Sequence, residues 1–305
     1  MFPPGIEHLN LSFNQLTFIR NQAFRSMGRL RTLLLNNNQI STISDGAFSL
    51  LDALVKLDLS QNNISTLPEG FSLGLGSLRE LSLANNHLTG INGVSFKHMD
   101  ALQKLNLSQN AINSIKIRAF GSLSTLRRVY LDGNNISSLS NGVFSMLRNL
   151  EVLGLKNNSI DHLDVGVLAP LTSLTMLNLA YNKLHAVDFK AFLSLHTHST
   201  HILLEGNPWK CECDLQRDFR KLHSVQRFIL DDYENLTCYK PLQLQGDALR
   251  DVDSQLCFAE TVTVLIITIT VFITGVAAIV MAETKRKKKN KGKHWTEVND
   301  MSCDS

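Results

Sequence analysis

Residues 102–110 read Leu-Gln-Lys-Leu-Asn-Leu-Ser-Gln-Asn, a motif of the form Leu-x-x-Leu-x-Leu-x-x-Asn. The motif recurs along the chain with its final asparagine every 24 residues. The evenly spaced asparagines are Asn14, Asn38, Asn62, Asn86, Asn110, Asn134, Asn158 and Asn182, and Asn207 follows after 25 residues. A fixed period of this length predicts a chain built from stacked structural repeats, in which each turn contacts only its neighbours.

The centre of the motif predicts a short strand, because apolar and variable residues alternate there. Stacked copies should form a parallel sheet on the concave side of a curved solenoid. Each asparagine lies where the chain turns inward. Its amide can donate to and accept from the backbone of neighbouring turns, and so satisfy buried polar groups.

A second apolar residue follows the asparagine by ten positions in most copies, and it predicts a stacked spine of rings inside the convex side. This position holds Phe24, Phe48, Phe96, Phe120, Phe144 and Phe192, with Leu168 in place of phenylalanine once and Phe71 one residue early. We interpret these residues and the motif leucines as the hydrophobic core. They stabilise the fold and do not carry the function.

These features resemble the leucine-rich repeat family over residues 6 to about 207. The resemblance implies an α/β-type leucine-rich repeat solenoid over residues 1–206, with eight full repeats. The ninth copy is degraded, with Ser199 in its first leucine position, and it ends at Asn207.

Residues 207–214 read Asn-Pro-Trp-Lys-Cys-Glu-Cys-Asp, and Cys238 and Cys257 follow. Four cysteines allow three pairings, and a four-cysteine zinc site is the alternative. The pattern resembles the C-terminal cysteine-rich cap of extracellular leucine-rich repeat proteins, here residues 207–260. The resemblance implies the disulfides Cys211–Cys238 and Cys213–Cys257. Residues expected to cover the open edge of the last repeat are Trp209, Leu215, Phe219 and Leu222.

Residues 262–282 carry no charged side chain and are long enough to span a bilayer, so we expect a transmembrane helix at 261–282. The tail, 283–305, holds seven of the 30 Lys and Arg residues, between Lys285 and Lys293. The tail therefore carries the whole net charge of +3. This local excess of basic residues does not indicate that the protein binds nucleic acid. Cations this close to a membrane attract anionic lipid.

The basic run predicts a cytoplasmic C-terminus and an extracellular N-terminus at the plasma membrane. No secretory signal or cysteine-containing cap precedes the first repeat, so we expect a truncated product whose edge, from Ile6 to Leu16, is prone to aggregation. A tail anchor that leaves the repeats in the cytosol is the alternative orientation.

The variable positions of each strand predict the binding surface, because they face solvent on the concave side. They mix charges and aromatic rings, a composition suited to a protein ligand. The candidate ligand-binding residues are Lys56, Arg79, Lys104, Arg127, Arg128, Tyr130 and Tyr181. For each residue alone, a solvated strand face is the simpler interpretation.

Six Asn-x-Ser/Thr sequons predict glycosylation and so favour a secreted route. They are Asn10, Asn63, Asn106, Asn135, Asn157 and Asn235. Asn106 lies within a concave strand, so a glycan there would obstruct part of the binding face.

No catalytic motif was found, and we expect no enzyme activity, cofactor or metal. The layout is similar to the ectodomains of Toll-like receptors, which act in innate immunity, and of repeat-containing adhesion proteins, but it lacks a cytoplasmic signalling domain. This predicts a cell-surface recognition glycoprotein that binds a protein ligand or co-receptor. The alternative, also from resemblance, is an auxiliary subunit of a potassium channel that acts through the helix and basic tail.

Overall fold

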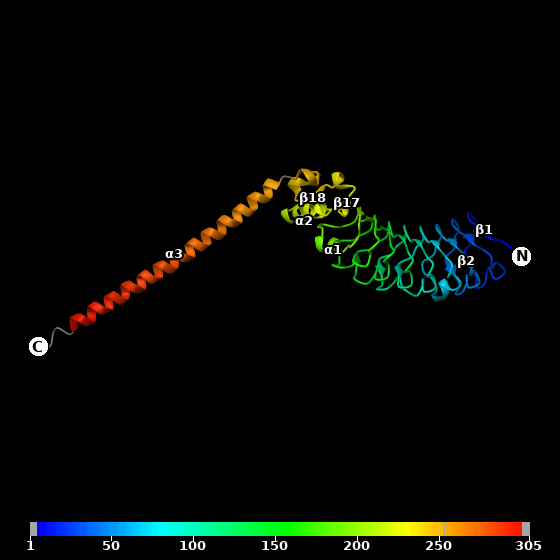
Figure 1. Cartoon of the computed structure of the whole chain (residues 1–305), viewed down its shortest axis with the longest axis horizontal. Coiled ribbons are helices and arrows are strands. Elements are labelled where there is room, and N and C mark those ends of the chain that lie inside the picture. Colours follow the sequence, from blue (N-terminus) through cyan, green and yellow to red (C-terminus); the bar gives the residue numbers. More distant parts are fainter. Residues whose placement is uncertain (1–4, 253, 301–305) are drawn as a thin grey trace. The chain divides into compact units, whose positions relative to one another are not determined.

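The computed structural model describes residues 5–252 and 254–300, with side chains described at 5–252 and 262–288. The chain divides into two compact units, Met1–Val252 and Asp253–Ser305. The first unit is a curved solenoid of repeated turns, and the second is a long helix (Figure 1). The leucine-rich solenoid predicted from the sequence is confirmed.

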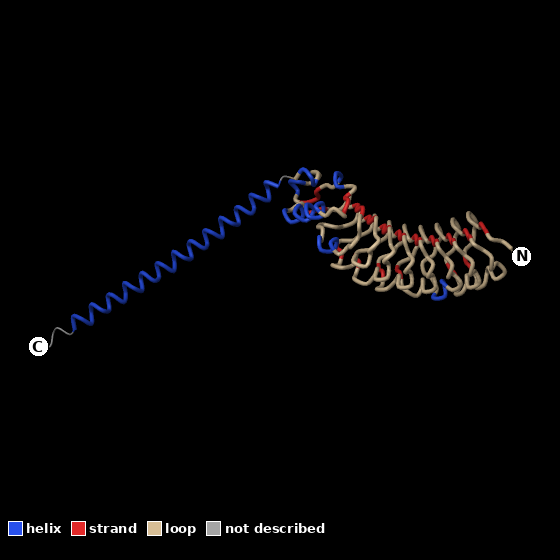
Figure 2. Tube along the Cα trace, in the orientation of Figure 1, coloured by secondary structure: helices blue, strands red, loops and turns tan. Residues whose placement is uncertain are grey.

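One parallel sheet runs along the concave side of the solenoid (Figure 2). Neighbouring turns pair in register, so that Lys104 lies beside Arg128 and Leu105 beside Val129. Within the described residues its ten strands, in spatial order, are β1 (His8–Asn10), β3 (Thr32–Leu34), β5 (Lys56–Asp58), β6 (Glu80–Ser82), β8 (Lys104–Asn106), β10 (Arg128–Tyr130), β12 (Val152–Gly154), β14 (Met176–Asn178), β15 (Thr200–Leu203) and β17 (Phe228–Leu230). The last strand comes from the cap, which the sequence pattern did not predict.

Shorter strands pair two by two away from this sheet. They are β2 (Phe18–Ile19) with β4 (Thr42–Ile43), β7 (Gly90–Ile91) with β9 (Ser114–Ile115), and β11 (Ser138–Leu139) with β13 (His162–Leu163). The third turn has the 3₁₀ helix η1 (Glu69–Ser72) in this region, next to Pro68. This is the same turn in which Phe71 comes one residue early.

The core lies between these two layers and consists of the motif leucines and the phenylalanine spine. Leu57, Leu81 and Leu105, one from each of three consecutive strands, are at most 1% exposed. The rings of Phe120 and Phe144 stack with centroids 6.3 Å apart. The expected spine of rings is therefore present.

The asparagines form a second internal ladder, as expected from their amides. The Nδ2 of Asn86 donates to the carbonyl oxygens of Leu59 and Leu83, at 3.0 and 3.1 Å. Its Oδ1 accepts from the backbone N–H of Ile64 at 3.0 Å. Each buried amide therefore joins its own turn to the turn before it.

The cap closes the last turn. The helix α2 (Cys213–Ser224) buries Leu215, Phe219 and Leu222, and Phe219 packs edge-on against the fully buried Trp209 at 5.2 Å. The remaining elements of this region are α1 (Phe189–Leu193), β16 (Trp209–Lys210), η2 (Tyr233–Asn235), β18 (Cys238–Lys240), η3 (Leu242–Leu244) and η4 (Leu249–Asp251).

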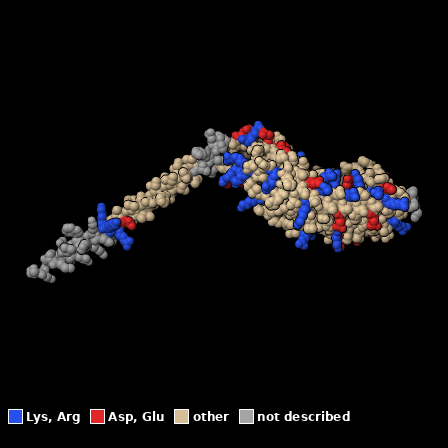
Figure 3. Space-filling view, viewed as in Figure 1, with Lys and Arg blue, Asp and Glu red and all other residues tan. Residues whose placement is uncertain are grey.

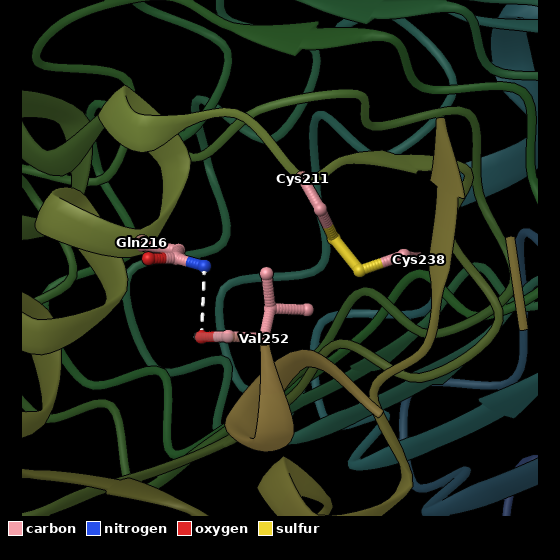
Figure 4. The surroundings of a disulfide bond; sticks show 4 residues. All are labelled: Cys211, Gln216, Cys238 and Val252. Carbon is pink, nitrogen blue, oxygen red and sulfur yellow. Dashed lines mark hydrogen bonds between the residues drawn. A yellow bond between two sulfur atoms is a disulfide. The ribbon is translucent and has the colours of Figure 1, made fainter. Parts of the chain in front are cut away.

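A disulfide joins Cys211 to Cys238, with Cα atoms 5.6 Å apart, and this is one of the pairings that the resemblance implied (Figure 4). Nearby, the Gln216 amide donates to the carbonyl oxygen of Val252 at 3.1 Å and ties the end of this unit to α2. Cys213 is also disulfide-bonded. The side chain of Cys257, its expected partner, lies outside the described residues. Oxidised sulfur at Cys211, Cys213 and Cys238 argues against the zinc alternative.

The second unit is the helix α3 (Ser254–Asp300). Its segment Val262–Lys288 is long and apolar enough to cross a membrane. The helix continues without a break into the basic residues from Lys285 onward. Thr268 and Thr274 donate their hydroxyls to backbone carbonyls within the helix, which removes the cost of placing them in lipid.

Candidate binding surface

The strands place one column of charged side chains across the middle of the concave sheet. Lys56, Glu80, Lys104 and Arg128 occupy the first position of four adjacent strands and lie side by side in register. Their side chains face outward because the middle residue of each strand, such as Leu105, faces the core. Figure 3 shows the solenoid from the side, where Lys and Arg residues are interspersed with Asp and Glu residues.

Two of the predicted binding residues are engaged in ion pairs with neighbouring turns. Lys56 Nζ lies 3.6 Å from a carboxylate oxygen of Glu80, and Arg127 contacts Glu151. All four side chains remain at least one-third exposed, so these ion pairs add little to stability. The same side chains can therefore leave these pairs and form ion pairs with a ligand. Arg79 is exposed immediately before β6.

Lysines lie over both predicted tyrosines. Lys104 Nζ is 5.9 Å from the ring centroid of Tyr130, and Lys156 Nζ is 4.9 Å from that of Tyr181. A lysine at this distance is attracted to the ring face by about 0.5–1 kcal/mol at an exposed site, which favours this orientation of the ring. The sequence identified Lys104 and both tyrosines but missed Lys156.

Tyr181 is fixed at its other end by Glu205. Its hydroxyl donates to Glu205 Oε1 at 3.0 Å, and this hydrogen bond, together with the carboxylate charge, raises the pKa of Tyr181. The ring lies directly over Gly206, where a Cβ would be only 2.5 Å from it. Gly206 also has a φ of +69°, so two independent constraints favour glycine there.

Asp132 joins the turn of Tyr130 to the turn of Lys156. Its Oδ1 accepts from the backbone N–H of Lys156 at 2.8 Å, while partial burial raises the pKa of its carboxyl group. Gly154 makes room for it, since a Cβ at Gly154 would lie 2.5 Å from Asp132 Oδ2. Tyr130 and Gly154 are neighbours in the sheet, so the contacts run across five successive turns, from Lys104 to Glu205.

We call this chain of contacts the concave strip. It consists of Lys104, Tyr130, Asp132, Lys156, Tyr181 and Glu205. Two of its members, Lys104 and Tyr130, lie in strands, and the other four lie two or three residues beyond the strand ends. Its rings and charged groups are held by one another and by the backbone, so little conformational freedom remains to be lost on binding.

The cap supports the end of the concave strip. Asp232 Oδ2 accepts from the backbone N–H groups of Leu204 and Glu205, at 2.7 and 2.6 Å. Its Oδ1 is buried and finds no hydrogen-bond partner among the described residues, and burial raises the pKa of this carboxyl group. Beside it, His201 Nδ1 lies 2.9 Å from Asp231 Oδ1.

Two sequon asparagines lie next to the concave strip. Asn157 follows Lys156 directly, and its backbone N–H donates to the carbonyl oxygen of Ala180, the residue before Tyr181. Asn106 is the other. It lies in β8 beside Tyr130 and is half-buried, and its Oδ1 accepts from the hydroxyl of Ser108 at 2.7 Å. The other five sequon asparagines are exposed: Asn10, Asn63, Asn135, Asn157 and Asn235. The side chains of these five asparagines are therefore more accessible for glycosylation than that of Asn106.

The missed members of the concave strip could have been found from the period alone. Residues 24 apart occupy neighbouring turns, so Asp132 predicts a contact near residue 156 and Tyr181 predicts one with Glu205. No such signal exists for Asp231 and Asp232, because the cap departs from the repeat. Among the described residues, no group of three or more His, Cys, Asp or Glu side chains is placed to hold a metal ion.

A model of the leucine rich repeat matches the chain over residues 4–64, 76–136 and 124–184. The comparison with curated protein sequences finds no match. Among solved structures, human 5T4 (Wnt-activated inhibitory factor 1, trophoblast glycoprotein) is 25% identical with a TM-score of 0.61, and the match covers 84% of this chain and 88% of that one.

Two longer repeat proteins share the fold. TLR13, in its complex with ssRNA13, is 24% identical with a TM-score of 0.63, and the match covers 83% of this chain and 40% of TLR13. Toll, in the Drosophila Toll–Spatzle complex, is 23% identical with a TM-score of 0.58, and the match covers 83% of this chain and 45% of that one. The chain thus spans less than half the length of either protein.

Proposed function

Because the chain belongs to the leucine-rich repeat family, we propose that it is a membrane-anchored recognition protein that binds a protein ligand or co-receptor through the concave strip. The observation that carries this proposal is the pair of lysine–tyrosine contacts in the strip. Tyrosines held in one orientation supply large contact areas at low entropic cost, and aromatic residues of this kind dominate binding energy at protein interfaces.

The charges of the concave strip favour a protein over RNA, the ligand in the TLR13 structure. Two carboxylates, Asp132 and Glu205, lie among its lysines. A surface that neutralises phosphates would be basic throughout, and carboxylates would repel the backbone of a nucleic acid. Interspersed signs instead suit the mixed surface of a protein partner.

The segment Val262–Lys288 supports a membrane anchor, and the basic residues that follow support a cytoplasmic C-terminus. We propose that the solenoid is extracellular at the plasma membrane and carries N-linked glycans.

The test displays the full chain on cells and measures capture of surface and serum proteins, with the bound proteins identified by mass spectrometry. Lys156→Glu and Tyr181→Ala should each reduce capture of the identified ligand at least about tenfold, as expected for residues at an interface centre. Reversal of Lys104 and Arg128 to glutamate should do the same.

Lys183→Glu is the matched control, because Lys183 is an exposed lysine of the same turn as Tyr181 but lies outside the concave strip. It should leave capture unchanged at equal surface expression. Capture that survives every substitution in the strip would reject the concave face as the binding site. If residues 258–305 alone shift the voltage dependence of a potassium channel, the auxiliary-subunit alternative replaces the proposal.

A further inference from the structure

A separate cavity of about 310 Å³ opens on the flank of the solenoid between the third and fifth turns. It is lined by Ser65, Thr66, Leu67, Leu88, Thr89, Gly90, Ile91, Asn92, Ser95, Phe96, Leu107, Ser114 and Lys116. None of these residues belongs to the concave strip.

The cavity arises where the flanking strands are interrupted. In the second turn the N–H of Ser44 donates to the Ile19 carbonyl at 2.8 Å, and in the fifth turn that of Lys116 donates to the Ile91 carbonyl at 3.1 Å. By the 24-residue period, the equivalent residue of the third turn is Pro68, which has no N–H to donate. Accordingly β4 pairs with β2 and β7 with β9, and in the described chain the segment 65–67 forms no strand between them.

The two ends of the cavity differ in chemistry. Its floor reaches the core residues Leu88, Phe96 and Leu107, which are at most 3% exposed. Its rim carries the exposed hydroxyl residues Ser65, Thr66, Thr89 and Ser114. The single charged residue of the lining is Lys116, also at the exposed rim.

We propose that this cavity binds a small anionic amphiphile, a medium-chain carboxylate whose apolar chain fills the floor and whose head group meets Lys116 and the rim hydroxyls. The volume is at the lower end of the range for small-molecule sites, which fits one such molecule. The apolar floor favours a chain that leaves water. The absence of any carboxylate in the lining, together with Lys116, selects a negative head group.

The test uses the full chain in lipid nanodiscs and a decanoate that carries a photoreactive diazirine at its apolar end. After illumination, labelled peptides are mapped by mass spectrometry, so partition into the bilayer is separated from binding in the cavity. Label is expected on the segment from Leu88 to Phe96, and unlabelled decanoate should compete it away. A trimethylammonium analogue of equal chain length should not label this segment.

Three substitutions make the test specific. Lys116→Gln should lower labelling about fivefold, the effect of one partly exposed charge contact. Gly90→Leu should abolish it, since a side chain there enters the cavity and its Cβ meets only Ser114, at 3.4 Å or more. Lys97→Gln, an exposed lysine outside the lining, should leave labelling unchanged.

Circular dichroism of each variant establishes that the solenoid is folded. If Gly90→Leu fails that check, Thr66→Phe at the exposed rim takes its place. The proposal is overturned if wild type and Lys116→Gln label equally, if the cationic analogue labels the same segment, or if label is confined to the helix Val262–Lys288.

Discussion

At the scale of single residues, the buried asparagines hold the solenoid together more than any exposed charge does. Asn86 is 5% exposed and satisfies two carbonyl oxygens and one backbone N–H through one amide group. A buried backbone group left without a partner costs about 1–3 kcal/mol, whereas an exposed ion pair contributes about 1 kcal/mol or less. The ion pair Lys56–Glu80 is of the second kind.

The substitution Asn86→Ala should therefore lower the free energy of unfolding by about 1–3 kcal/mol, because it leaves the backbone N–H of Ile64 unpaired and removes one of the two amide donors to the carbonyl oxygens of Leu59 and Leu83. Guanidinium unfolding of the full chain in detergent, followed by circular dichroism, measures the change. His87→Ala, at the exposed neighbouring position, should change it by less than about 0.5 kcal/mol. Equal effects for the two variants would contradict the role assigned to the amide.

Asp232 predicts a defined pH dependence of stability. Burial raises its pKa above the ordinary value of 3.8, so the folded chain favours its protonated form. Its contribution to stability is therefore fully present below that ordinary value and is lost as the pH rises through the folded-state pKa. Acidification from pH 7 should stabilise the wild type relative to Asp232→Asn, which cannot ionise. A stability difference between them that is constant from pH 7 to pH 4 would show that the carboxylate is not a buried charge.

At the scale of elements, the phenylalanine spine determines how successive turns stack. Phe120 and Phe144 are parallel at 6.3 Å, while Phe48 and Phe71 meet edge-on at 5.8 Å in the region of η1. The early position of Phe71 therefore changes the ring geometry without leaving a gap, since Phe71 is fully buried. The flanking strands, not the spine, are interrupted at this turn.

Phe144→Ala should destabilise the solenoid by about 3–5 kcal/mol, because it leaves a cavity in a fully buried position. Met146→Ala in the same turn removes a side chain that is 48% exposed, and it should cost about 1 kcal/mol or less. Thermal unfolding of the two variants beside the wild type compares them directly. A Phe144→Ala protein as stable as Met146→Ala would mean that the turns do not depend on the spine.

The repeat made the fold predictable from the sequence, because each apolar position of the motif recurs in eight copies. Strand positions, the asparagine ladder and the helix that contains Leu215, Phe219 and Leu222 all follow from local spacing. The strand motif alone identifies only half of the concave strip, namely Lys104, Tyr130 and Tyr181. Asp132, Lys156 and Glu205 follow only when residues 24 apart are compared as neighbours in adjacent turns. Strand β17 and Asp232 come from the cap, which has no period to extrapolate.

At the scale of the whole molecule, charge and polarity are distributed unequally between the two units. The segment Lys285–Lys293 carries seven cations, which together with the four acids of the tail give the net charge of +3. The exposed sequon asparagines Asn63, Asn135 and Asn157 lie in the solenoid. If the solenoid is extracellular, these asparagines and the basic run are separated by the membrane.

This arrangement predicts the outcome of a topology experiment on cells that express the chain with an epitope at its C-terminus. Glycosidase treatment should reduce the mass of the protein, and the triple substitution Asn63→Gln, Asn135→Gln and Asn157→Gln should remove most of that change. The epitope should be protected from external protease until the membrane is permeabilised. An unglycosylated chain whose repeats are reached only after permeabilisation would establish the tail-anchor orientation instead.

The asparagine ladder also has a mechanical consequence. Each amide clamps its own turn to the preceding one, so a pull between a ligand on the solenoid and the membrane anchor is shared by identical clamps in series. Such a chain should extend under tension in equal steps, each of which releases the 24 residues of one turn, or roughly 80 Å of extended chain. A solenoid of this kind would lengthen under force in increments and keep its remaining turns folded.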